Sequence, residues 1–151
     1  MTYALDDTEE RHDSAPDQTP PEPPKEEPAA PEQPPFILYQ GGDEFAQTLG
    51  RLAYWVHNLL IPVYGREVTS GAPWCPEWWQ HPEAVAQLHG LSLAWQEMTG
   101  PKSSLSGPAA WHRDFLLPAM SSLRDPSGPF SGCRPGAHRA KQVPPIAPFN
   151  T

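Results

Sequence analysis

Two cysteine–histidine pairs are the residues of this chain best suited to hold a metal ion. Cys75 is followed by His81 after five intervening residues, and Cys133 is followed by His138 after four. Two thiolates and two imidazoles make a four-ligand set that suits tetrahedral zinc and leaves no coordination position open. We therefore predict a zinc site held by Cys75, His81, Cys133 and His138. The alternative is that the cysteines are structural thiols and the histidines lie on the surface.

The predicted zinc site connects two distant parts of the chain. Its first pair precedes a predicted helix, whereas its second pair lies in a C-terminal segment that has little apolar content and no obvious anchor. A metal would staple this segment to a domain of modest size, and we expect the two sulfur atoms to lie within about 4 Å of each other. His138 is the hardest ligand to position, because Pro135 and Gly136 precede it.

Three of the six tryptophans surround the first pair, in the ten residues 74–83. An indole ring has roughly 150–250 Å² of accessible surface to bury, so leaving three rings this close together in water would cost considerable free energy. The stretch therefore predicts a tryptophan-rich core, in which Trp78 or Trp79 is buried together with Trp95.

Apolar residues recur at helical spacing in three segments, and these must position the predicted site. The segments cover residues 43–60, 82–99 and 108–123. Pro62 is expected to end the first helix, because the residue before a proline avoids helical angles. Pro118 is expected to kink or restart the third, because its ring clashes with the preceding turn.

The predicted fold is an all-α domain of three main helices over residues 36–138, with a leader before it and a tail after it. The leader, residues 1–35, carries the whole formal charge of −8, holds nine prolines and has almost no apolar side chains. Such a segment cannot offset its ordering entropy by burial, so it is predicted to be disordered. The tail, residues 139–151, is predicted to be irregular and flexible. The apolar run 36–39 predicts a short strand or an extended segment.

No stretch of the sequence has the pattern of a signal peptide or a membrane-spanning helix. The start of the chain is acidic rather than basic, and no apolar run approaches the roughly 20 residues that a helix needs to cross a bilayer. We therefore expect a cytoplasmic protein without a membrane partner. In that compartment two cysteines are more typical of thiols or metal ligands than of a disulfide.

The other titratable residues give no pattern of an active site. His112 and Asp114 lie two positions apart in a predicted helix, so they do not face each other. His57 and His89 lie beside apolar helix positions, which favours histidines at the edge of the core. The chain also lacks a glycine-rich phosphate loop and a serine nucleophile elbow. We therefore do not expect an enzyme, and a metal-dependent enzyme remains only an alternative.

Basic residues near the C-terminus suggest another alternative, a nucleic-acid-binding accessory protein. Residues from 102 onward carry a net charge of +4, and basic side chains can approach phosphates. They are interleaved with prolines, however, and nucleic-acid readers usually carry a denser basic stripe. The residues concerned are Arg124, Arg134, Arg139 and Lys141.

Four stretches of the sequence resemble an actinobacterial family catalogued as domain of unknown function 4913. They are residues 43–45, 61–64, 74–85 and 128–133, and the most specific of them reads WCPEWWQHPEAV. The similarity runs from about Tyr39 to His138. The resemblance implies a protein of the kind often found on plasmids and integrative elements, and it assigns no activity.

The pattern of the resembled family includes the positions of Cys75, His81 and Cys133, which is compatible with a metal site. Where its members tend to have histidines after Trp111, this chain has Phe115 and Ala119, so any function of those histidines is expected to be absent here. We conclude from the sequence that the chain is a non-enzymatic interaction or accessory module with an unidentified protein partner and a structural zinc site.

Overall fold

The structure is a computed structural model, and it describes residues 14–17, 19–26 and 35–150. The chain divides between residues 33 and 34. Before that division, the described residues form no helix or strand and are exposed. Most of the predicted disordered leader lies outside the described residues.

After the division the fold is all-α, as predicted. The first long helix consists of α1 (Gly42–Trp55), the π-helical turn η2 (Val56–Leu60) and α2 (Ile61–Tyr64). The second is α3 (Pro82–Thr99). The third consists of α4 (Gly107–Trp111), the π-helical turn η4 (His112–Leu116) and α5 (Leu117–Leu123).

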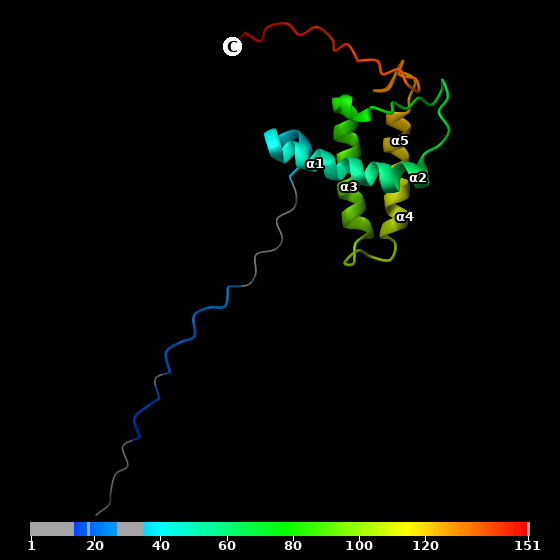
Figure 1. Cartoon of the computed structure of the whole chain (residues 1–151). Coiled ribbons are helices and arrows are strands. Elements are labelled where there is room, and N and C mark those ends of the chain that lie inside the picture. The colour runs from blue at the N-terminus through cyan, green and yellow to red at the C-terminus, as the bar shows by residue number, and fades with distance from the viewer. Residues whose placement is uncertain (1–13, 18, 27–34, 151) are drawn as a thin grey trace, which may run out of the picture. The chain divides into compact units, whose positions relative to one another are not determined.

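Helix α3 is the centre of the domain, because it contacts α1, α4 and α5. It runs beside the α4–α5 helix, and the α1–α2 helix crosses it (Figure 1). Its buried face includes Ala84, Leu88 and Leu91, as the helical spacing predicted. Between residue 35 and residue 150, no helix is long and apolar enough to cross a membrane.

The prediction that Pro62 ends the first helix is wrong. The helix continues to Tyr64, because the turn before the proline widens: the Ile61 backbone N–H donates to the Val56 carbonyl five residues back. A π turn gives the proline ring room that an α turn lacks, and so the helix passes through the proline.

A π turn likewise lets the third helix continue through Pro118. The Leu117 N–H donates to the His112 carbonyl five residues back, and α5 begins with the proline in its first turn. The irregularity predicted at Pro118 as a kink or a restart is therefore a π turn. The two prolines occupy matching positions, because each follows a residue whose backbone N–H donates to the carbonyl five residues back.

The run at residues 36–39 was expected to be a strand or an extended segment, but it forms a short 3-10 helix, η1 (Ile37–Tyr39). Only Ile37 is buried there, and its backbone N–H donates to His89 Nδ1 at 3.2 Å. Side-chain burial and one long-range hydrogen bond therefore hold this segment, and no neighbouring strand within the described residues pairs with it.

The tryptophans do form part of the core, although in a different pairing from the one predicted. Trp78 is 1% exposed, whereas Trp79 is 42% exposed. Trp95 is only partly buried, and its ring lies 6.0 Å from that of Trp55 on α1. Trp111 at the end of α4 is fully buried. The pairing depends on how α1 crosses α3, which helical spacing alone does not give.

Candidate metal centre

Cys75 and His81 lie in the segment that leads into α3, and both are buried. The short 3-10 helix η3 (Trp78–Gln80) lies between them. His81 has extended backbone angles, φ −107° and ψ 104°, as expected for a residue before a proline. Pro82 then starts the helix, so the direction of the His81 side chain is tied to the axis of α3.

Cys133 and His138 reach the same place through a series of turns after α5. Phe130 is fully buried and packs against Trp74 at 4.8 Å and His81 at 5.2 Å between ring centroids. The aromatic contact returns the chain to the core. The Cys133 N–H then donates to the Phe130 carbonyl at 3.0 Å. Burial of one aromatic ring therefore positions the third ligand candidate.

The sharp turns on both sides of Cys133 require glycine. Gly132 has a φ of +78°, and a Cβ there would meet the Arg139 side chain at 2.7 Å. Gly136 has a φ of +75°. Both angles lie in the left-handed region that glycine adopts at no steric cost. Reciprocal hydrogen bonds between Arg134 and Ala137 close the second turn, and His138 follows it directly. This turn positions the ligand that was hardest to place from the sequence.

All four predicted ligand residues converge. Their ligand atoms lie within 4.8 Å of one another. Cys75 Sγ is 3.3 Å from His138 Nδ1, and Cys133 Sγ is 3.5 Å from His81 Nε2. Bonds of about 2.0–2.3 Å to a tetrahedral zinc ion put neighbouring ligand atoms about 3.3–3.8 Å apart. The donor set and these two distances therefore fit a metal of this kind.

Burial shifts the pKa of two of the ligand candidates, Cys75 and His81. Burial raises the pKa of the Cys75 thiol to about 11, a hydrogen bond from the Glu77 backbone opposes that rise, and the nearby Cys133 adds to it. Burial, followed by the nearby His138 and Lys141, lowers the pKa of His81. At neutral pH His81 is therefore a neutral imidazole with a free lone pair, and Cys75 keeps its proton until a cation displaces it.

Two backbone groups support the sulfur atoms. The Arg139 N–H donates to Cys133 Sγ at 3.4 Å, and Glu77 supplies the hydrogen bond to Cys75. Such bonds stabilise a thiolate, as contacts around metal ligands commonly do. Sequence reasoning missed both groups, because a backbone amide carries no signature of residue type.

In the part of the chain that the structure describes, the three other histidines make hydrogen bonds away from the metal centre. His57 Nε2 accepts from the buried Trp78 indole N–H at 3.0 Å, and His89 is buried beside η1. His112 is exposed, with its Nε2 2.8 Å from the Tyr64 hydroxyl. It does not pair with Asp114, whose carboxylate accepts from Arg113 at 2.8 Å. The expectation that His112 and Asp114 do not form a dyad is therefore confirmed.

Comparison with known proteins identifies one family. The pattern of a family described as "Domain of unknown function (DUF4913)" matches residues 50–151. The match starts later than the resemblance expected from the sequence, includes all four ligand candidates, and continues through the tail. Neither the curated proteins nor the solved structures give a match. Because the matched residues make up more than half of the chain, this protein belongs to the DUF4913 family.

Proposed function

We propose that this chain is a non-enzymatic interaction module whose C-terminal segment is fastened to the helical domain by a structural zinc ion. The observation that carries the proposal is the convergence of four ligand atoms within 4.8 Å. Cys75 and His81 would hold the ion from the start of α3, and Cys133 and His138 from the C-terminal segment. Bound zinc would supply the cross-link that these two segments otherwise lack.

The ligand set favours a structural role over a catalytic one. Catalytic zinc sites generally have three protein ligands and an open position for water or substrate, whereas structural sites have four. Here four protein ligands are available, and Cys75, His81 and Cys133 are buried. A metal-dependent enzyme would require one of the four, most readily the half-buried His138, to leave the metal.

The tail supports the interaction part of the proposal. Val143, Ile146 and Phe149 are 79–90% exposed, although each is large and apolar. They recur every third residue among prolines, and a polyproline II helix has three residues per turn, so in that conformation all three lie along one edge. Aromatic-lined grooves in partner domains bind proline-rich segments in this conformation. A partner protein with a groove of this kind fits the tail.

The basic segment supports nucleic-acid binding less well. The Arg124 guanidinium donates to the backbone carbonyls of Glu67 and Ala72, and Lys141 pairs with Glu83 at 3.4 Å. Arg124, Arg134 and Arg139 have no ion pair within the described residues, but the contacts of Arg124 with the two carbonyls hold its guanidinium against the protein, so two of the four basic residues considered from the sequence are left without a contact of this kind. Two charges give only a shallow dependence of binding on salt. An accessory role on a mobile element, which the resemblance implies, is compatible with a protein partner.

Metal content tests the zinc proposal. Untagged protein purified without chelator should contain one zinc ion per chain by elemental analysis. Cobalt should replace zinc and give the visible absorption of a tetrahedral thiolate site. Cys75→Ala and His81→Ala should abolish both signals, whereas Ser131→Ala, the matched control near the site, should leave them unchanged. Less than one tenth of an equivalent of zinc, together with no cobalt spectrum, would overturn the proposal.

Site-specific photocrosslinking in cells tests the tail separately. A photoreactive residue at Ile146 should crosslink to a protein partner, and the same residue at Ala147, on another edge of the polyproline helix, should crosslink far less. Equal crosslinking at both positions would exclude recognition of a single edge. Crosslinks to nucleic acid instead of protein would favour the accessory role in nucleic-acid binding.

A further inference from the structure

A small cavity lies between α1 and α3, formed by residues other than those of the metal centre. Its volume is about 170 Å³. For comparison, a cavity of about 150 Å³ accommodates benzene. Two leucines contribute to its wall, and the polar residues that line it are Thr48, Arg51, Trp55, His89, Ser92 and Gln96. Acidic side chains are absent from this lining.

His89 contributes a hydrogen-bond donor to this lining. Its side chain is 5% exposed, and its Nδ1 accepts the Ile37 backbone N–H at 3.2 Å. A neutral imidazole whose Nδ1 accepts carries its proton on Nε2. Phe36 stacks on the ring at 5.7 Å between centroids, which fixes the plane of the imidazole. No acceptor within the described residues bonds to the Nε2–H.

Trp55 contributes a second donor. Its indole Nε1 is buried and has no hydrogen-bond partner in the described part of the chain. An unpaired buried N–H costs about 1–3 kcal/mol, so such groups in folded proteins usually have a partner. Because Trp55 lines the cavity, a molecule inside it could accept this hydrogen bond. Contact with the Trp95 ring at 6.0 Å holds the indole in place.

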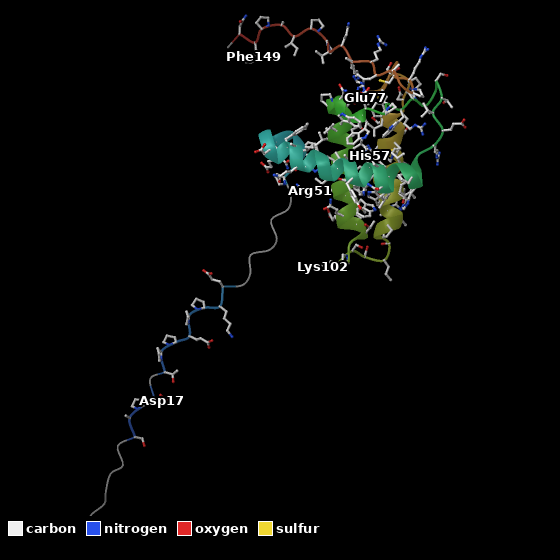
Figure 2. All side chains as sticks on the ribbon, in the orientation of Figure 1. Asp17, Arg51, His57, Glu77, Lys102 and Phe149 are labelled. Atoms are coloured by element: carbon white, nitrogen blue, oxygen red, sulfur yellow. The ribbon has the colours of Figure 1, made fainter. Side chains whose placement is uncertain are left out.

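Arg51 contributes a positive charge. Its Nη2 donates to Thr48 Oγ1 at 3.1 Å, which holds the guanidinium against α1, and Figure 2 labels it on that helix. Among the described residues Arg51 forms no ion pair. The cavity therefore combines an uncompensated cation with two N–H donors. This combination matches a ligand that has only acceptor atoms and a negative charge.

We propose that the cavity between α1 and α3 binds a small oxyanion, either a carboxylate or a phosphate group, through Arg51, Trp55 and His89. The Arg51 guanidinium supplies the charge and can bind two oxygen atoms at once, a geometry that suits both groups. The indole and imidazole N–H groups complete the hydrogen bonds to the oxygens. The site shares no residue with the metal centre, so a negative result for the zinc proposal would leave the oxyanion proposal unaffected, and the reverse also holds.

Nuclear magnetic resonance titration of the full chain tests the proposal. Nitrogen-15-labelled protein is titrated with sodium acetate or with sodium phosphate, while sodium chloride keeps the ionic strength constant. The indole N–H signal of Trp55, identified by its loss in Trp55→Phe, should shift and saturate with one of the two anions. Saturation with acetate assigns a carboxylate, and saturation with phosphate assigns a phosphate group.

Matched arginine variants distinguish a specific site from general attraction of anions. Arg51→Gln should weaken binding at least tenfold, whereas Arg66→Gln, an exposed arginine at a different cavity, should leave it unchanged. Arg51 is itself exposed, so its replacement should not prevent folding. A Trp55 signal that moves linearly with both anions, or saturates equally in Arg51→Gln, would overturn the proposal.

Discussion

Removal of the metal should release the C-terminal segment from the core and lower the stability of the whole domain. Without the metal, the largest contribution that holds this segment is the burial of Phe130, worth about 1.5–3 kcal/mol, together with a few backbone hydrogen bonds worth about 1 kcal/mol each. Ordering about ten residues costs about 10 kcal/mol or more. The apolar contacts alone therefore cannot hold the segment.

The size of the loss follows from the metal itself, because it binds the folded state and not the unfolded chain. A ligand present at about a thousand times its Kd stabilises the folded state by about 4 kcal/mol. Departure of the segment also uncovers the ring of Trp74 and removes the fully buried Phe130 ring from the core. A domain of this size loses about 4–8 °C in melting temperature for each kcal/mol, so we expect chelation to lower the melting temperature by about 16 °C or more.

Calorimetry before and after dialysis against a chelator measures this loss, and added zinc should restore the original value. Cys133→Ala should melt like the chelated protein and should not respond to the chelator. Ser131→Ala, which leaves the ligands intact, should behave like the unchanged protein. Equal melting temperatures with and without chelator, in protein shown to contain metal, would refute the reasoning.

The other predictions concern the core, the pH dependence and the leader. Trp78→Ala should cost about 3–5 kcal/mol and Trp79→Ala less than half as much, because only the former ring is fully buried; urea unfolding that gave equal losses would contradict this. Burial, followed by Arg51, lowers the pKa of His89 below its ordinary 6.5. A base whose pKa is lower in the folded state than in the unfolded state adds stability above pH 6.5, and this contribution is lost as the pH falls below that value. The loss of stability with falling pH should therefore be smaller in His89→Gln. Equal acid sensitivity of the two proteins would argue against this role of His89. Deletion of the leader, residues 1–35, should change the melting temperature by only a few degrees, and a larger drop in calorimetry would mean that the leader packs on the domain.

The sequence was enough to predict the all-α class and the approximate extent of the helices. Apolar spacing identified α3 from Pro82 to Thr99, because a proline at the start and a glycine–proline pair after the end are local signals. The same reasoning failed at Pro62, since it allowed only α-helical geometry. A π turn depends on the packing of the whole helix, and no residue type announces it.

The four ligand candidates were also recognisable from the sequence, because cysteine and histidine are rare and their paired spacing is a local feature. Their convergence was a matter of tertiary structure. It required Phe130 to pack against Trp74 and His81, and it required Gly132 to turn the chain back. Contacts between residues 49 and 56 positions apart depend on how the elements pack, which residue spacing does not specify.

The cavity between α1 and α3 illustrates the same limit. In sequence, Arg51 and Trp55 are two residues of the first predicted helix, 43–60, and His89 is a core-edge histidine of the second. Together they form a donor-lined cavity only because α1 crosses α3 at that point. Local patterns determine which residues form helices and which carry donors or thiols, since both are properties of short segments. Which donors face each other is decided only by the packing of those helices. That packing depends on the free energy of the whole chain and not on that of any short segment.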